Sequence, residues 1–520
     1  MNTDLYLGPS LRALEQRHAE DDLMRRAGTA AADWAGELAL PGGLPVLVVA
    51  GPGNNGGDAL VAARLLRERF FAVTVVFAGD TARLPADAAT AWQDFTAAGG
   101  STVEVIPERQ RWALVIDGLF GIGLGRPPEG RHAALIEAIN HIAERDRCPV
   151  LALDCPSGLD AERGAAPGVV VRATHTLTFI AGKPGLLTAD GPDYCGQIRL
   201  ARLDLDPPAE LPPDGRCITP ATFAEHLLPR QRNSHKGNFG SVGVVGGAPS
   251  MVGAAFLAAR AALKLGAGRV YAGLIDPQAP DFDPLQPELM LRRPQALLQT
   301  PLTALACGPG LGISLEASEL VETAIALDLP LLLDADALNL VGSEENLQQA
   351  LAKRRLPALL TPHPGEAGRL LEIGADEVQA DRLAAAREIA RRYRCHVALK
   401  GCGTVVATVD GQWWINDSGN SGMATAGMGD VLSGLVLALL GQGWPPVPAL
   451  LAGVHLHGAA ADRLVAAGIG PVGLTASEIA DAARLLFNDW LRQPPRWRRR
   501  RHAVRTVYNA HPPIRQSLAP

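Results

Sequence analysis

The hydrophobic positions change from helical spacing to short apolar runs within the first fifty residues. Residues 11–39 are rich in Ala, Leu, Glu and Arg at helical spacing, which predicts one or two helices. β-Branched runs then cover residues 45–50 and 72–77, and between them lie a glycine-rich turn and a helix predicted from Ala59 to about Arg69. This order predicts a βαβ unit with its turn at the carboxyl end of the first strand.

Apolar runs that end in polar or glycine residues continue along the rest of the chain. Further strands are predicted at 112–116, 150–153, 242–247, 331–333, 359–360 and 397–399. A proline-rich segment near residues 209–218 separates the two series and has the composition of a linker. The pattern therefore predicts two α/β domains, each with a largely parallel sheet.

Composition narrows the range of partners and compartments. The 520 residues are 47% hydrophobic and 20% charged, and a formal net charge of −6 argues against nucleic acid as a partner. The seven cysteines form no C-x-x-C pair and are odd in number, which disfavours a disulfide framework or zinc knuckle. With neither a leader nor a membrane span visible, we expect a cytoplasmic protein that binds small molecules and forms a homo-oligomer.

Polar residues follow three of the predicted strands of the first half. Asn55 lies after the first strand, Asp117 ends the third, and Asp154 and Ser157 follow the fourth. Because the carboxyl ends of parallel strands meet at one edge, we expect these residues to share a pocket. Carboxylate, amide and hydroxyl oxygens without His or Cys suit a monovalent or hard divalent cation better than zinc. A turn or helix cap is the alternative role for either aspartate.

The first glycine-rich turn satisfies the G-x-G-x-x-G pattern through Gly51, Gly53 and Gly56, which makes a NAD-dependent dehydrogenase an alternative function. Asp58 argues against it, because its negative charge falls at the helix start, where a pyrophosphate would bind. The candidate acid for the ribose, Asp80, also comes late after the turn.

A loop of small residues at 416–430 runs directly into an apolar helix predicted at 431–440. Backbone N–H groups in such a loop, with the positive end of the helix dipole, can hold a phosphate. Asp430 lies where the helix begins, and since a carboxylate would repel phosphate, we interpret it as a base for a reacting hydroxyl. A helix cap is the alternative. Lys236 and Lys400, each beside glycine, are candidate phosphate contacts.

In their order and joint presence, these motifs resemble the bacterial bifunctional NAD(P)H-hydrate repair enzymes, in which an NAD(P)HX epimerase is fused to an ADP-dependent NAD(P)HX dehydratase. NAD(P)HX is hydrated NADH or NADPH. The resemblance covers roughly residues 10–490, and its motifs are residues 51–58, 117, 121–127, 154–157, 234–237, 307–310, 361–366, 400–401 and 422–430.

The resemblance implies an α/β fold with an N-terminal Rossmann-like three-layer αβα domain and a C-terminal ribokinase-like αβα domain. The predicted boundaries are an epimerase at 1–208, a linker at 209–218, a dehydratase at 219–493 and a basic tail, expected to be disordered, at 494–520. The first domain would interconvert R and S NAD(P)HX. The second would return the S form to NAD(P)H with ADP as co-substrate, giving AMP and phosphate.

The resemblance also implies the residues of both sites. The epimerase residues that bind NAD(P)HX match Asn54, Asn55, Gly56, Gly57, Asp58, Gly121, Ile122, Gly123, Leu124, Gly125, Arg126, Pro127 and Asp154, of which Asp154 is the acid–base candidate. The ligands of a potassium ion match Asn55, Asp117 and Ser157. The dehydratase residues that bind NAD(P)HX match Gly253, Ala254, Gly310, His363 and the candidate base Asp430. The ADP-binding residues match Lys400, Gly401, Cys402, Gly403, Thr404 and Gly429, and Mg²⁺ would accompany ADP.

The 416–430 loop departs from the family pattern at three positions, where Ser421, Ala426 and Met428 replace the usual Pro, Gly and Thr. A positive φ at Ala426 would strain the loop, and Met428 lacks a hydroxyl that could contact phosphate. A small-molecule kinase of the ribokinase type is an alternative for the second half, because it shares the loop and Asp430. It would release a stable phosphorylated product. A non-enzymatic NAD sensor is an alternative for the first half.

Overall fold

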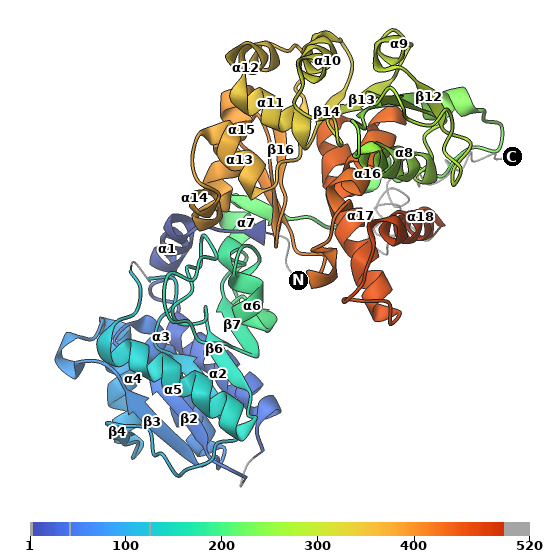
Figure 1. Ribbon diagram of the computed structural model, residues 1–520. Coiled ribbons are helices and arrows are strands. Elements are labelled where there is room, and N and C mark those ends of the chain that lie inside the picture. Colours follow the sequence, from blue (N-terminus) through green and yellow to red (C-terminus); the bar gives the residue numbers. More distant parts are fainter. Residues whose placement is uncertain (1–3, 41–42, 124–125, 493–520) are drawn as a thin grey trace, which may run out of the picture. The chain divides into compact units, whose positions relative to one another are not determined.

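The computed structural model describes residues 4–40, 43–123 and 126–492, and the chain divides into two compact units. The first unit is formed by Met1–Cys217 with Leu338–Asp417, and the second by Ile218–Ala337 with Ser418–Pro520. Figure 1 shows helices against strands in both. The predicted basic tail at 494–520 lies outside the described residues.

Seven parallel strands form the sheet of the N-terminal part of the first unit, in the order β4-β3-β2-β5-β6-β7-β8. Their bounds are Val46–Ala50 for β2, Val73–Phe77 for β3, Thr102–Val103 for β4, Leu114–Gly118 for β5, Val150–Leu153 for β6, His175–Phe179 for β7 and Gln197–Ala201 for β8. The strand order reverses at β2, which pairs with β3 on one side and β5 on the other. Ligands of open α/β sheets bind beside such a reversal, at the carboxyl ends of the strands.

Helices cover both faces of this sheet, which confirms the predicted three-layer arrangement. Their bounds are Gly8–Arg17 for α1, Leu23–Leu38 for α2, Asn54–Glu68 for α3, Ala86–Ala97 for α4 and Gly130–Asp146 for α5. Successive residues of a strand face opposite sides. Val46 and Val48 accordingly share a core cluster with α2, α3 and α4, whereas Leu47 and Val49 share one with α5. Helix α3 begins at Asn54 and not at Ala59 as predicted, so the Asn-Asn-Gly-Gly-Asp stretch is helical.

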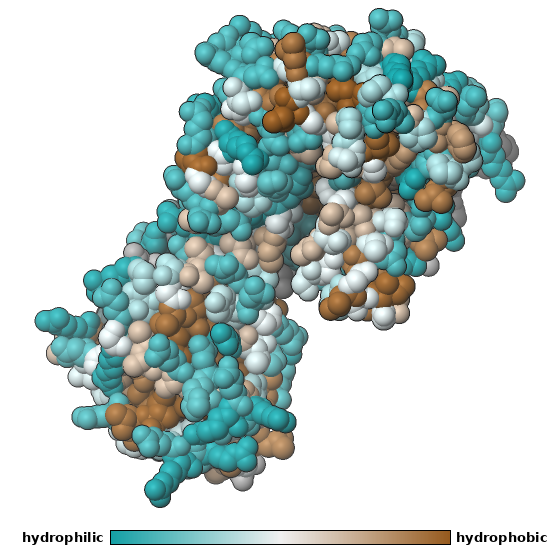
Figure 2. Space-filling view, viewed as in Figure 1, coloured by the Kyte–Doolittle hydropathy of each residue, from teal (hydrophilic) through white to brown (hydrophobic). Residues whose placement is uncertain are grey.

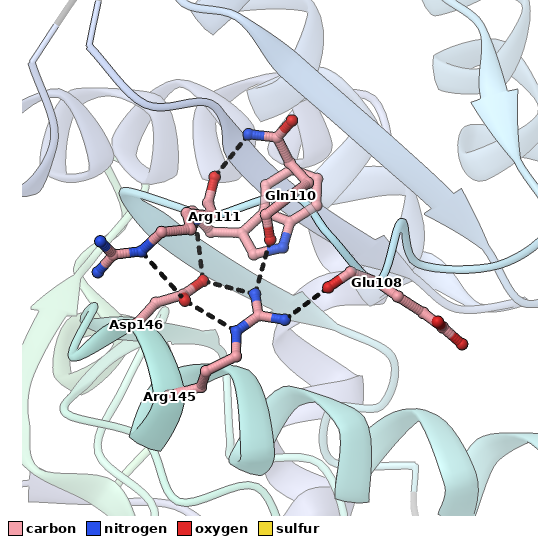
Figure 3. A network of polar contacts seen from close by, with 6 residues as sticks. Glu108, Gln110, Arg111, Arg145 and Asp146 are labelled. Carbon is pink, nitrogen blue, oxygen red and sulfur yellow. Dashed lines mark hydrogen bonds and ion pairs between the residues drawn. The ribbon is translucent and has the colours of Figure 1, made fainter.

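An ion pair between Arg145 and the buried Asp146 fixes the C-terminal end of α5 to the segment before β5 (Figure 3). The Asp146 carboxylate is 1% exposed, accepts two hydrogen bonds of 2.8 Å from Arg145 and one of 3.0 Å from the backbone N–H of Trp112. Arg145 in turn donates to the carbonyl oxygens of Glu108 and Gln110. The hydrogen bonds from Arg145 lower the pKa of Asp146.

The first unit also contains a mixed set of strands in the order β1-β9-β18-β17-β16-β15. The bounds are Asp4–Leu5 for β1, Gly215–Cys217 for β9, Leu359–Leu360 for β15, His396–Leu399 for β16, Thr404–Ala407 for β17 and Trp413–Asn416 for β18. The predicted linker therefore contains β9, which pairs in parallel with β18. The helices are Gly191–Cys195 for α6, Pro207–Glu210 for α7, Glu345–Ala352 for α12, Pro364–Leu371 for α13, Ala375–Ala380 for α14 and Arg382–Tyr393 for α15; α11, Asp336–Ser343, begins in the second unit.

The second unit contains five parallel strands in the order β12-β11-β10-β13-β14. The strands are Ser241–Gly246 for β10, Arg269–Leu274 for β11, Met290–Arg292 for β12, Ala304–Cys307 for β13 and Leu331–Leu333 for β14. The helices are Val252–Lys264 for α8, Pro294–Leu298 for α9, Leu315–Ala326 for α10, Met428–Gly441 for α16, Pro446–Ala466 for α17 and Ala476–Arg492 for α18. Helix α16 is buried from Val431 to Gly441, as expected for a helix that is apolar on all sides.

Hydrophilic residues cover most of the face seen in Figure 2, and hydrophobic residues form separate patches on it. Within the described part of the chain, no helix combines the length and apolar character needed to cross a bilayer. The predicted α/β class is confirmed by the parallel strands and their covering helices.

Candidate active sites

A cavity of about 920 Å³ lies at the carboxyl ends of β2, β5, β6 and β7 in the first unit. The segments that follow these four strands line it, together with side chains from α1, α2, α3 and α4. The cavity thus lies at the reversal of strand order, where ligand binding is expected for this topology.

The structure brings together most of the predicted epimerase residues and leaves some apart. The predicted residues that line the cavity are Asn54, Asn55, Asp58, Gly121, Ile122, Gly123 and Asp154. Gly56 and Gly57 are buried in the first turns of α3, and Arg126 and Pro127 are exposed and do not line the cavity. Leu124 and Gly125 lie outside the described residues. Burial, and then the charge of Asp154, raises the pKa of Asp58 well above its usual range.

The three residues predicted to bind a cation come from three neighbouring segments. The buried Asp117 carboxylate at the end of β5 accepts a hydrogen bond of 2.7 Å from the Ser157 hydroxyl and one of 2.9 Å from its backbone N–H. Burial raises the pKa of Asp117 to about 6. Asn55 is buried, yet neither polar atom of its carboxamide has a hydrogen-bond partner. An unpartnered buried amide and a buried carboxylate fit an oxygen-coordinated cation.

Asp154 forms a buried ion pair with Lys183, which was not predicted as a site residue. The Nζ of Lys183 lies 2.6 Å from Asp154 Oδ1, and the two side chains are 2% and 13% exposed. Lys183 also donates to the Thr178 hydroxyl at 2.7 Å and to the Phe179 carbonyl at 3.2 Å. Both members of the pair line the cavity. A carboxylate and an ammonium group this close together can pass a proton between them. Such a pair is suited to acid–base chemistry.

Gly121 lies next to both Asp154 and Asn55 in the lining of the cavity. A Cβ atom placed on Gly121 would lie 2.9 Å from Asp154 Oδ2 and 3.6 Å from Asn55 Cγ. Because glycine has no Cβ atom, the side chains of Asp154 and Asn55 stay accessible to the same ligand.

In the second unit, the loop before α16 is held by a carboxylate from α17. The Asp462 carboxylate accepts hydrogen bonds from the Gly419 N–H at 2.8 Å and the Asn420 side chain at 2.9 Å. The positive φ of the loop end, 87°, falls at Gly427, which caps α16. Ala426 does not have a positive φ, so the backbone strain that a positive φ would cause there is absent. Asp430 lies in the first turn of α16.

The other predicted dehydratase residues of the second unit lie at the carboxyl ends of β10 and β13 and at the start of α16. Gly253 and Ala254 are in the first turn of α8, and Gly429 is in the first turn of α16. Gly310 has φ 58°, and a Cβ atom there would lie 2.6 Å from the Met251 carbonyl and 3.1 Å from Ala254 Cβ. Gly310 and Ala254 are therefore neighbours, as the predicted site requires.

In the first unit, His363, Lys400 and the turn that ends at Thr404 follow β15 and β16. His363 Nδ1 accepts from the Gly365 N–H at 3.0 Å, and its Nε2 lies 3.3 Å from Glu366 Oε1. The buried Glu366 carboxylate also lies 3.7 Å from Lys400 Nζ. His363 and Lys400 are therefore linked through one acid.

Residues missed from the sequence include Lys183, Glu366 and Asp462. The signal for Lys183 is weak: a Gly-Lys-Pro-Gly turn directly after an apolar strand. Glu366 stands in the motif at 361–366, but its role as a partner of two site residues depends on tertiary contacts. Among the described residues, no group of three or more His, Cys, Asp or Glu side chains is placed to hold a metal ion.

The fold and the first cavity define an α/β protein with a ligand-sized pocket at the carboxyl ends of parallel strands. Residues 20–185 match the family model described as YjeF-related protein N-terminus, and residues 242–484 match the model described as NAD(P)H-hydrate dehydratase. The chain is 37% identical over 507 residues to a bifunctional NAD(P)H-hydrate repair enzyme of Coxiella burnetii, covering 94% of this chain and 100% of that one. It is 38% identical over 483 residues to that of Escherichia coli, covering 90% and 89%.

The chain belongs to the family of bifunctional NAD(P)H-hydrate repair enzymes. This confirms the predicted family and the order of its two halves. The crystal structure of an ADP/ATP-dependent NAD(P)H-hydrate dehydratase from Bacillus subtilis is 30% identical, with a TM-score of 0.46, and covers 53% of this chain and 98% of that one.

Proposed function

We propose that the chain carries out both reactions of its family on hydrated NADH and NADPH. The N-terminal part interconverts the R and S forms, and the C-terminal part converts S-NAD(P)HX to NAD(P)H with ADP. The observation that carries the first half is that Asp154, Lys183 and the unpartnered Asn55 carboxamide line one cavity.

Epimerisation needs the hydroxyl on carbon 6 of the reduced nicotinamide ring to change faces. In the proposed step, Asp154 removes the hydroxyl proton, the bond between carbon 6 and N1 breaks, and N1 takes the electron pair and a proton from Lys183. The open-chain aldehyde rotates and N1 attacks its other face. The two protons then return, so that acid and base are regenerated.

Potassium would be held by Asn55, Asp117 and Ser157, whose buried oxygens fit it. When bound, it supplies positive charge that anchors oxygens of the nucleotide beside the cavity. Hydrogen bonds within the protein also order this site. Ser157 Oγ accepts from the Phe120 N–H at 2.9 Å and so fixes the segment after β5.

In the dehydratase half, the hydroxyl on carbon 6 is a poor leaving group until it is phosphorylated. Asp430 accepts its proton as the oxygen attacks the β-phosphorus of ADP and AMP departs. Phosphate then leaves carbon 6, and the loss of a proton from carbon 5 restores NADH. The N–H groups at the start of α16 stabilise the transferring phosphoryl group. Mg²⁺ would accompany ADP through its phosphate oxygens.

The test uses purified S-NADHX with and without ADP. NADH absorbance should recover only with nucleotide, and AMP and phosphate should form in a one-to-one ratio with NADH. A stable phosphorylated product without NADH would contradict the proposal and favour a small-molecule kinase. The domain boundaries at 1–208, 209–218 and 219–493, the cytoplasmic location and the homo-oligomeric state stay predictions.

A further inference from the structure

The turn predicted to bind ADP, Lys400–Thr404, rests on a segment that directly follows the epimerase cavity. This segment contains Thr188, five residues after Lys183. The Thr188 side chain is buried, and its hydroxyl lies 2.8 Å from the Gly403 carbonyl and 3.2 Å from the Cys402 carbonyl. The Ala189 N–H also donates to the Cys402 carbonyl at 3.2 Å.

Arg382, the first residue of α15, supports the same turn from the other side. Its guanidinium donates to the Leu399 carbonyl at 3.1 Å, to the Lys400 carbonyl at 3.2 Å and, through Nε, to the Thr188 hydroxyl at 3.1 Å. The side chain is 1% exposed, and burial lowers its pKa to about 10. The chain Arg382 Nε–H to Thr188 Oγ1–H to the Gly403 carbonyl is therefore a buried hydrogen-bond network.

Two glycines allow this close contact. Gly401 has φ 142°, and a Cβ atom there would lie 2.8 Å from the Arg382 guanidinium. Gly403 has φ 61°, and a Cβ atom there would lie 2.0 Å from the Leu187 carbonyl. Side chains at either position would push the turn away from the segment beneath it.

The network sets the direction of the N–H groups of the turn. A trans peptide unit is planar, with its N–H opposite its carbonyl. Since the carbonyls of Lys400 and Cys402 point toward Arg382 and Thr188, the N–H groups of Gly401 and Gly403 point away from them. Backbone N–H groups presented in this way are the donors that bind phosphate oxygens.

We infer that Thr188 and Arg382 are positioning residues for the dehydratase, through which the epimerase half orders the ADP-binding turn of the same chain. The inference rests on the proposed binding of ADP at Lys400–Thr404. It joins the two activities through the segment Lys183–Thr188, whose first residue carries the ammonium group of the epimerase pair.

The test is Thr188→Val, which keeps the shape of the side chain but removes the hydroxyl. We expect the KM for ADP in S-NADHX dehydration to rise about tenfold, equal to about 1.4 kcal/mol, with kcat within about twofold. Epimerisation of R-NADHX should keep its rate. Thr188→Ser restores the donor and should return the KM to within about twofold of wild type.

Thr176→Val is the matched control, because its buried hydroxyl also donates to a carbonyl, that of Cys195 at 2.7 Å, within the same domain. It should leave the KM for ADP unchanged. An unchanged KM in Thr188→Val, or an equal rise in Thr176→Val, would overturn the positioning role. Lys400→Ala distinguishes a failure of the positioning role from a failure of the proposed ADP site. If Lys400→Ala also leaves the KM for ADP unchanged, ADP does not bind at the turn and the proposed site itself is wrong.

Discussion

Replacing Lys183 by Met removes the ammonium group from the epimerase cavity while it retains an unbranched side chain of similar length. In the wild-type protein the Lys183 Nζ contacts Asp154 Oδ1 at 2.6 Å, the Thr178 hydroxyl at 2.7 Å and the Phe179 carbonyl at 3.2 Å. Lys183→Met therefore leaves Asp154 as an uncompensated carboxylate, 13% exposed, beside an apolar side chain.

The expected costs follow from this burial. Removing one partner of a buried ion pair destabilises a protein by about 3–5 kcal/mol. The loss of a positioned acid or base lowers the rate by about 10²–10⁴-fold. Adding Asp154→Asn to Lys183→Met removes the unpaired carboxylate. The double variant should therefore regain most of the lost stability, to within about 1–2 kcal/mol of wild type, but none of the lost rate.

Two measurements follow the two effects separately. Hydrogen exchange of the amides of β6 and β7 reports the free energy of local opening beside the pair. Isomer-resolved chromatography reports the conversion of R-NADHX to S-NADHX without ADP. ADP-dependent dehydration of S-NADHX serves as the control, and it should change little. An epimerisation rate within about threefold of wild type in Lys183→Met would refute the acid–base role of Lys183. A double variant no more stable than Lys183→Met would refute the stabilising role of the Asp154–Lys183 ion pair.

Three further outcomes are expected. Asp430→Asn should lower ADP-dependent recovery of NADH absorbance by at least about 10²-fold and leave epimerisation intact; an unchanged rate would remove it as the base. Potassium in place of choline should raise the unfolding midpoint by about 2–4 °C for each kcal/mol of binding, in wild type but not in Asp117→Asn; equal shifts in both would exclude the site. Since Arg145 lowers the pKa of Asp146, the stabilisation is present above the ordinary pKa near 4 and is lost as pH falls through the lowered pKa. Asp146→Asn should therefore lower the free energy of unfolding by about 1–3 kcal/mol at pH 7, and the difference should shrink as the pH falls below the ordinary pKa of an aspartate; a constant difference across a urea series at several pH values would contradict this.

The strands of the first domain could be predicted from sequence because parallel, doubly covered strands are continuous apolar runs. The run at 45–50 became Val46–Ala50, and the run at 150–153 became Val150–Leu153. The parallel topology also predicted that Asn55, Asp117, Asp154 and Ser157 would share one pocket. Asn55 and Asp154 line the cavity, whereas Asp117 and Ser157 are buried and do not line it.

Helix α3 was placed too late because two asparagines and two glycines favour a turn in local propensity. In the structure Gly56 and Gly57 are buried, and a Cβ atom on Gly57 would lie 2.6 Å from the Met24 side chain. Close packing against α2 therefore overrides the local preference. Lys183 was missed for a related reason: its contact with Asp154 depends on how the turn after β7 folds back toward the end of β6, which no local pattern encodes.

The most direct measurement supplies separated R-NADHX, with ADP, to Asp154→Asn, to Asp430→Asn and to an equimolar mixture of the two variants. If one chain holds two separate sites, each variant alone should give NADH from the R form no faster than spontaneous epimerisation or dehydration allows. The mixture should restore the conversion, because S-NADHX made by one variant diffuses to the other. Rapid NADH formation from the R form by either variant alone, or no recovery in the mixture, would contradict the division of the repair reaction between Asp154 and Asp430.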